Sequence, residues 1–205
     1  PTPAMTFDPN AAAKPGSGIY GLPHSVDEAR VVVLPVPFDA TTSYGKGAAR
    51  GPDAIFEASH QVDLFDLETG RPYEQGIAMY AYRRPEALQL KRWNAEARRL
   101  AEPVIEAGGD VGGDRKLQAA LGKVNELSER VNALVYETAM TLIRQGKLVA
   151  LVGGDHATPF GSIRAHAEAY PGMGVLHVDA HADLRVAFEG FVWSHASIMY
   201  NVAEQ

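Results

Sequence analysis

Two short apolar runs, each followed at once by residue types that bind metals, constrain the fold of this chain more than any other feature. Residues 148–152 read Leu-Val-Ala-Leu-Val and lead into Gly-Gly-Asp-His at 153–156. Residues 174–178 read Gly-Val-Leu-His-Val and lead into Asp-Ala-His-Ala-Asp at 179–183. Such runs predict buried strands. With a helix predicted over 159–169, they form a β-α-β unit with parallel strands and a right-handed crossover.

The N-terminal residues differ in composition from the rest of the chain. Residues 1–24 are rich in Pro, Gly, Ala and Asn without an apolar period, which predicts an extended arm of the kind that covers a neighbouring subunit. Residues 25–205 then form a single α/β domain, and its first strand is expected over 31–34, where three valines precede a leucine.

Helical periodicity marks the segments between the strands. A short helix is expected to begin at Gly51, because Pro52 is tolerated in a first turn, and to turn Ile55 and Ala58 inward. A longer helix is predicted from about 86 to 107 by apolar residues at three- and four-residue spacing.

That longer helix contains Pro103, which is expected to kink or divide it. The next helix is predicted to carry apolar residues from Leu117 to Leu142, with Asp114 as the cap of its first turn and Gly146 as the cap of its end.

Composition excludes several classes of function. The formal charge is −6 and no long basic run is present, which argues against a nucleic-acid groove and suits a small cationic ligand. There is no cysteine, so any metal must be held by His and carboxylate. A chain without disulfides also fits the reducing cytoplasm. No export signal or bilayer-length apolar run is found, so no membrane partner is expected and a cytoplasmic location is predicted.

The alternation of Asp179, His181 and Asp183 places three ligand types on one face of an extended segment. His156 would join them from the neighbouring strand end, with Asp155 in a supporting role. Two divalent ions about 3.5–4 Å apart can hold a hydroxide between them at neutral pH. A single Asp-x-His-x-Asp is more often a solvated turn, but two ligand groups at successive strand ends favour a two-metal hydrolytic site.

The two groups together resemble the arginase/agmatinase (ureohydrolase) family. The resemblance extends upstream to Pro-Val-Pro-Phe at 35–38, Thr-Ser-Tyr at 42–44 and Gly-Pro-Asp-Ala-Ile at 51–55, so it covers most of the chain. It implies a three-layer α-β-α fold with a mainly parallel sheet, assembled as homotrimers or hexamers.

The resemblance also implies a role for each candidate site residue. His156 would bind one manganese ion and His181 the other, with nickel as the alternative metal. Asp179 would bridge the two ions and Asp183 would complete the shell of the His156 ion. His195 resembles the family's proton-shuttling histidine. A separate expectation is that Ser43 and Tyr44 contact the substrate, although a loop of hydroxyl residues and glycine needs no function to form.

Part of the family pattern is not found in these residues. A further Asp-x-Asp strand and a glutamate facing the guanidinium are missing, so the C-terminal part of the fold is expected to be absent and residues 1–205 alone inactive. A subunit completed by a partner chain, or a non-catalytic binding subunit, is the alternative.

The expected reaction is metal-dependent hydrolysis of guanidine or agmatine to urea plus ammonia or an amine. Arginine is the least favoured substrate, because residues 184–188 lack the polar contacts expected for an α-amino acid. His177 is expected to be a hydrogen-bonded core group in its strand, or a group that supports the metal ligands without binding the metal. A one-zinc deacetylase of the histone-deacetylase-like group would leave Asp183 and His156 unexplained.

Overall fold

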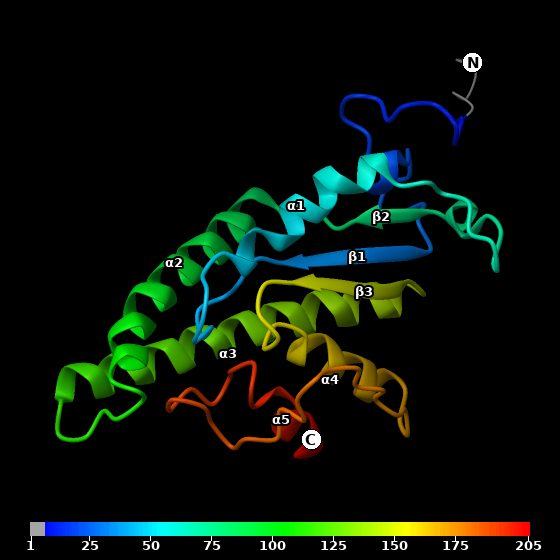
Figure 1. The fold of residues 1–205 in the computed structure, drawn as a ribbon. Helices are drawn as coiled ribbons and strands as arrows, with labels where there is room; N and C mark the ends of the chain where they lie inside the picture. Colours follow the sequence, from blue (N-terminus) through cyan, green and yellow to red (C-terminus); the bar gives the residue numbers. More distant parts are fainter. Residues whose placement is uncertain (1–6) are drawn as a thin grey trace.

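A computed structural model describes residues 7–205, and a three-stranded parallel sheet lies at its centre (Figure 1). Its strands are β1 (Val31–Val36), β2 (Ile77–Met79) and β3 (Leu148–Gly153). The order is β2-β1-β3, so β1 is central and pairs through Val31 with both Ile77 and Leu148. The strands expected near 31–34 and 148–152 are therefore confirmed, whereas β2 was not predicted.

The central strand contains a proline at a position where the sheet tolerates it. Pro35 lies opposite Val152 of β3, but β2 has already ended opposite Val33. A proline cannot donate a ladder hydrogen bond, so it is confined to strand edges and ends. Because β2 is short, the side of Pro35 that faces away from β3 has no strand partner, and β1 can continue to Val36.

The prediction of a strand over residues 174–178 is wrong. The segment has no regular secondary structure and pairs with no described strand, and Leu176 and Val178 are 90% and 87% exposed. Within residues 7–205, β3 has a partner on one edge only. An apolar run shows that a segment can form a strand, but pairing also requires a free strand edge in suitable register. The chain that follows α4 (Phe160–Ala169) does not pair with such an edge.

The long helices follow the sequence prediction closely. They are α2 (Arg84–Glu106) and α3 (Arg115–Arg144), and α4 also lies where it was predicted. Asp114 caps α3 as expected, because its Oδ1 accepts hydrogen bonds from the amides of Lys116 at 2.8 Å and Leu117 at 3.2 Å. Gly146 follows the helix with a φ of 76°, in the left-handed region that favours glycine. Pro103 does not divide α2, which continues to Glu106.

The inward face predicted for α1 (Gly51–Ala58) is wrong. Ile55 and Ala58 are both exposed, and the helix buries Pro52 instead. The first turn of α1 lies against the end of β3, where a Cβ on Gly51 would be 3.2 Å from the carbonyl oxygen of Gly153. A helix of eight residues has too few apolar positions for its period to determine which side is buried.

The core lies between the sheet and the long helices. Leu34 and Val36 of β1 pack in one cluster with residues of α2, α3 and α4, among them Leu90, Val131 and Ala165. In Figure 1 the sheet lies between α1 above and α3 and α4 below, which is the expected three-layer α-β-α arrangement. None of the helices formed by residues 7–205 combines the length and apolarity needed to cross a bilayer.

The N-terminal segment packs more closely than an extended arm. Ile19 and Leu22 are buried, and the amide of Tyr20 donates to Ser59 Oγ at 2.9 Å. Residues 1–6 of the predicted arm lie outside the described residues, and its contact with a neighbouring subunit stays a prediction.

The remaining short helices are α5 (Ile198–Ala203) and the 3-10 turns η1 (Ile19–Gly21), η2 (Ala48–Arg50), η3 (Ser59–Gln61) and η4 (Pro72–Gln75).

Candidate metal centre

The loop after β3 is held against the end of β1 by backbone contacts. Gly154 donates to the carbonyl of Val36 at 3.0 Å, and Asp155 donates to the carbonyl of Phe38 at 2.9 Å. A Cβ on Gly154 would lie 1.9 Å from the Phe38 oxygen, so only glycine fits this approach. His156 follows directly and projects from the carboxyl end of the sheet, where open α/β sheets place their ligands.

Asp155 is a buried carboxyl that organises this loop. Its Oδ1 accepts the amide of Ala157 at 3.0 Å, and its Oδ2 accepts the hydroxyl of Thr41 at 3.3 Å. Burial raises the pKa of Asp155 to about 6, although these hydrogen bonds partly oppose the shift. The loop-structuring role expected of Asp155 agrees with these contacts.

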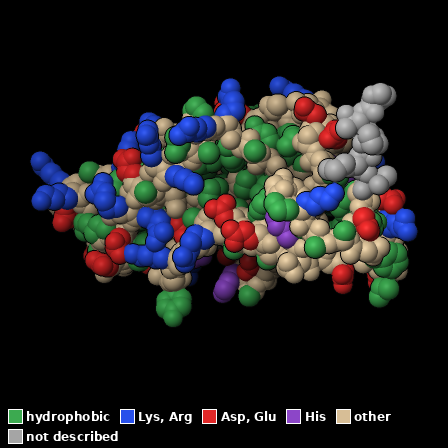
Figure 2. Space-filling model, turned by 90° about the horizontal axis from the view of Figure 1, so that it is seen from above, with side chains coloured by type: hydrophobic (Ala, Val, Ile, Leu, Met, Phe, Trp, Pro, Cys, Tyr) green, Lys and Arg blue, Asp and Glu red, His purple; other side chains and the backbone are tan. Residues whose placement is uncertain are grey.

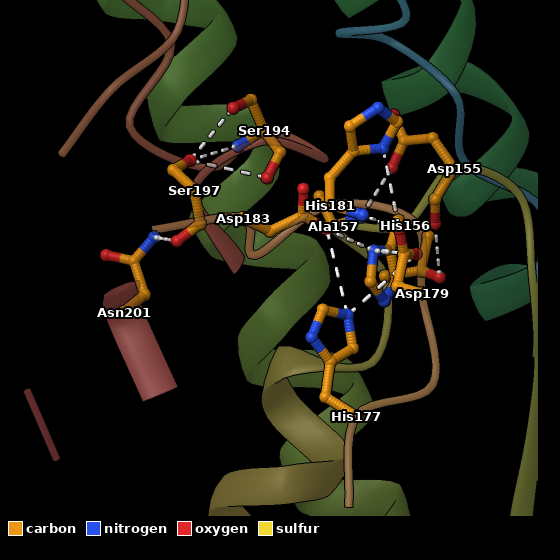
Figure 3. A network of polar contacts seen from close by, with 11 residues as sticks. Asp155, His156, Ala157, His177, Asp179, His181, Asp183, Ser194, Ser197 and Asn201 are labelled. Atoms are coloured by element: carbon orange, nitrogen blue, oxygen red, sulfur yellow. Dashed lines mark hydrogen bonds and ion pairs between the residues drawn. The ribbon is translucent and has the colours of Figure 1, made fainter. Parts of the chain in front are cut away.

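Four side chains converge beyond this loop, those of His156, His177, Asp179 and Asp183 (Figure 3). Each offers one ligand atom, and these four atoms lie within 4.8 Å of one another. His156 Nδ1 is 2.8 Å from Asp183 Oδ2 and 3.6 Å from Asp179 Oδ2. His177 Nε2 is 3.8 Å and 3.9 Å from the same two carboxylates, Asp179 and Asp183 respectively. The two imidazole rings stack with centroids 5.3 Å apart.

The geometry of this group fits a divalent cation. A six-coordinate ion with bonds of about 2.1 Å separates neighbouring ligand atoms by about 3 Å and opposite ones by about 4.2 Å. The distances from His156 and His177 to the two carboxylates, 2.8 to 3.9 Å, lie close to these values. His177 Nε2 is buried and lacks a hydrogen-bond partner, although it faces two carboxylates. Imidazole and carboxylate together suit manganese, nickel, cobalt or zinc.

The two oxygens of Asp179 face different neighbours. Oδ2 points into the group of four, whereas Oδ1 accepts the amide of His181 at 2.8 Å and lies 3.5 Å from His181 Nδ1. The hydrogen bond from the His181 amide, together with the surrounding histidines, lowers the pKa of Asp179. The carboxylate is thus ionised at neutral pH and has one oxygen directed to each side.

His181 stands outside the group of four, with a side chain that is 81% exposed. His177 occupies the position inside the group. The sequence interpretation placed His177 in a buried strand, but the segment is unpaired and its side chain turns toward the carboxylates. The signal was available, because His177, Asp179, His181 and Asp183 alternate at two-residue spacing.

Asp183 has an unusual backbone that directs the next segment. Its φ is 52°, in the left-handed region, and its carbonyl accepts the amides of Met199 at 3.1 Å and Tyr200 at 3.2 Å at the start of α5. The amide of Arg185 donates to the carbonyl of Ala196 at 3.1 Å. The segment around 195 is therefore fastened beside Asp183.

A serine network holds the turn that carries His195. Ser194 and Ser197 share a hydrogen bond of 2.8 Å between their hydroxyl groups (Figure 3). The Ser197 hydroxyl also donates to the carbonyl of Val192 at 2.7 Å. His195 packs edge-on against Phe188, with centroids 5.5 Å apart. Its Nδ1 is buried and has no hydrogen-bond partner among residues 7–205. His195 is not a member of the four-residue group.

The predicted substrate residues Ser43 and Tyr44 lie at the exposed tip of a loop. Tyr44 is 97% exposed, and Ser43 is exposed as well. The base of the loop is fixed, since Thr41 bonds Asp155, and Asp39 accepts the amides of Gly47 and Ala49 at 2.9 and 3.1 Å. The tip is thus free while both of its ends are anchored.

Known proteins share this sequence pattern and fold. The profile described as "Arginase family" matches residues 29–205. N(1)-aminopropylagmatine ureohydrolase of Thermus thermophilus is 37% identical over 177 residues, which are 86% of this chain and 47% of that protein. Agmatinase of Bacillus subtilis (strain 168) is 27% identical, over 87% of this chain and 49% of that protein. The chain spans about half the length of the curated relatives it matches.

Solved structures show the same fold. Agmatine ureohydrolase of Thermoplasma volcanium aligns with a TM-score of 0.59 at 20% identity, over 88% of this chain and 48% of that one. Proclavaminate amidino hydrolase from Streptomyces clavuligerus aligns with a TM-score of 0.59 at 19% identity, over 95% of this chain and 54% of that one.

Proposed function

Because the chain belongs to the arginase family, we propose that it provides the metal-binding half of an enzyme that hydrolyses a guanidino compound. The products are urea and an amine, or urea and ammonia. The observation that carries this proposal is the convergence of two histidines and two carboxylates at the carboxyl end of the sheet, where His177 Nε2 has no other partner.

The proposed metal site contains two ions. His156, Asp179 and Asp183 would hold the first, with His177 beside them, and Asp179 together with His181 would hold the second. The opposed directions of the two Asp179 oxygens support this division. Manganese is the proposed metal and nickel the alternative. When bound, such ions make water nucleophilic at neutral pH and stabilise developing negative charge.

The side chains of this chain supply the remaining functions. The carboxylates of Asp179 and Asp183 would offset part of the positive charge of the ions that they hold. Water adds to the guanidinium carbon and the bond from that carbon to the leaving nitrogen breaks, so the leaving amine needs a proton. We assign its delivery to His195, whose Nδ1 has no competing partner and whose ring is held against Phe188.

The proposed substrate class is an aliphatic guanidino amine. Relatives at 37% and 27% identity are named for aminopropylagmatine and agmatine respectively. Ser43 and Tyr44, on the loop anchored by Thr41, are proposed to contact this substrate as the loop closes. Free guanidine remains the alternative substrate. The proposed assembly is a homotrimer or hexamer.

A urea-release assay tests the proposal. The protein is expressed from its host gene, loaded with Mn²⁺ or Ni²⁺, and assayed with agmatine, aminopropylagmatine, guanidine and arginine. Asp183→Asn should abolish urea release, whereas His166→Ala, on α4 outside the metal group, should leave it unchanged. Urea release that survives Asp183→Asn would contradict the assignment, and so would release that is independent of metal.

A second candidate is a metal-binding subunit that a partner chain completes. The exposure of His181, Leu176 and Val178 beside the metal group favours it, because these side chains offer a ligand and an apolar surface to further polypeptide. Under this candidate residues 1–205 bind metal and release no urea until the partner is added. Under both candidates residues 1–205 alone are expected to be inactive.

A further inference from the structure

A cavity of about 490 Å³ lies between α2 and the loop that follows β1. One wall is a stripe of α2 that includes Lys91, Arg98 and Arg99. The facing wall contains Lys46 and Arg50, from the loop and from η2 at the start of α1. Cationic side chains from two separate segments of the chain thus line this open cavity.

Within residues 7–205, two of these five cations form salt bridges and three form none. Lys46 pairs with Glu102, and Arg98 Nε lies 3.6 Å from Asp39 Oδ1. Arg50, Lys91 and Arg99 form no salt bridge with any residue of the described chain. Asp53 and Glu102 are the acidic lining residues, so the lining carries five positive and two negative charges, a net charge of +3.

This balance is the opposite of that of the whole chain, whose formal charge is −6. Figure 2 shows Lys and Arg side chains gathered over the α2 side of this face, with Asp and Glu side chains between some of them. Charges of one sign in a concave site raise the local concentration of ions of the opposite sign. A cationic guanidino compound is therefore repelled here, and an anion is attracted.

From this geometry we propose that the cavity binds a small molecule carrying a phosphate or diphosphate group. Guanidinium groups form paired hydrogen bonds with phosphate oxygens. Arg50 and Arg99 line the cavity from different segments of the chain, and we expect both to contact the bound group. Pro37, Ala49 and Ala95 add apolar surface for the body of the ligand. The limited volume and the absence of a long basic run exclude an extended nucleic acid.

The site is also connected to the loop that carries Ser43 and Tyr44. Asp39 contacts Arg98 of the helix wall and accepts the amides of Gly47 and Ala49 from the loop wall. A ligand that joins Arg50 to α2 therefore restrains the base of this loop. Bound ligand is expected to slow amide exchange over residues 46–50.

Titration calorimetry with pyrophosphate tests the proposal, in metal-free buffer at constant ionic strength. Wild-type protein should bind one equivalent with a Kd of about 1 mM or tighter. Arg50→Gln and Arg99→Gln should each weaken binding about tenfold or more, because each removes a charge-assisted hydrogen bond. Arg92→Gln, a matched change on α2 outside the cavity lining, should leave the Kd unchanged. Circular dichroism of each variant checks that it is folded.

Three results would overturn the proposal, the first two of which concern the binding of pyrophosphate itself. One is the absence of saturable binding, and the other is an equal loss of affinity in Arg92→Gln, which would indicate general charge attraction. A pyrophosphate affinity matched by sulfate at the same ionic strength would also refute a phosphate-type site. Because no metal or guanidino substrate is present, the outcome is independent of the proposed hydrolysis.

Discussion

Replacing Asp39 by alanine should destabilise the protein strongly, although Asp39 belongs to no proposed ligand set. Its side chain is fully buried just after β1. Its Oδ2 accepts the amides of Gly47 at 2.9 Å and Ala49 at 3.1 Å, and its Oδ1 accepts Asn94 Nδ2 at 3.1 Å. One carboxylate thus joins the sheet, the loop that carries Ser43 and Tyr44, and helix α2.

The magnitude follows from these three donors. A buried donor that loses its acceptor costs about 1–3 kcal/mol. The amides of Gly47 and Ala49 lie near the surface and can be hydrated after loop movement, so they contribute at the lower end of this range. We therefore expect Asp39→Ala to lower the free energy of unfolding by about 2–4 kcal/mol. With a urea m-value of about 2 kcal/mol per M, the midpoint falls by about 1–2 M.

Equilibrium urea unfolding, followed by circular dichroism, measures this difference. Asp63→Ala is the matched control, because Asp63 is exposed and its removal should change the midpoint little. A loss below about 0.5 kcal/mol in Asp39→Ala, similar to that of an ordinary surface change, would refute the reasoning. It would mean that the loop and α2 are held in place by other contacts.

Two further predictions concern metal binding and pH. His177→Ala should weaken Mn²⁺ binding about tenfold or more, since it removes an imidazole that faces both carboxylates. His181→Ala should reduce the number of bound ions from two to one. Calorimetry measures the Kd and metal analysis the number of ions, and an unchanged Kd in His177→Ala would show that His177 does not belong to the site. Burial alone would raise the pKa of Asp39, but its hydrogen bonds and Arg98 outweigh burial and lower it. Its contribution to stability should therefore be complete above the unfolded-state pKa of 3.8 and be lost as the pH falls below that value. Unfolding measured between about pH 5 and pH 2 should show this acid loss in wild type and a smaller one in Asp39→Ala.

Local sequence patterns predicted the elements whose determinants are themselves local. The three- and four-residue spacing of apolar side chains located α2 and α3, and Asp114 and Gly146 marked the ends of α3, because helix periodicity and capping depend on residues within one or two turns. Periodicity did not determine the buried side of α1. Its first turn is held against Gly153, which is distant in the sequence.

The candidate site divides in the same way. The alternation of ligand types identified His156, Asp179 and Asp183 as a candidate group, and the structure brings these three together. The inclusion of His177 in place of His181 depends on the path of residues 174–183 after α4. That path follows from which strand edges are within reach, and not from the order of residues within the segment.

The sequence alone therefore determined the family resemblance, the long helices, two strands and the types of ligand. Tertiary structure decided the strand order β2-β1-β3, the unpaired state of residues 174–178, the two-sided position of Asp179 and the basic cavity beside α2. Each of these depends on contacts between segments that are far apart in the chain. Backbone pairing and charge proximity arise only when those segments meet, so no local pattern encodes them.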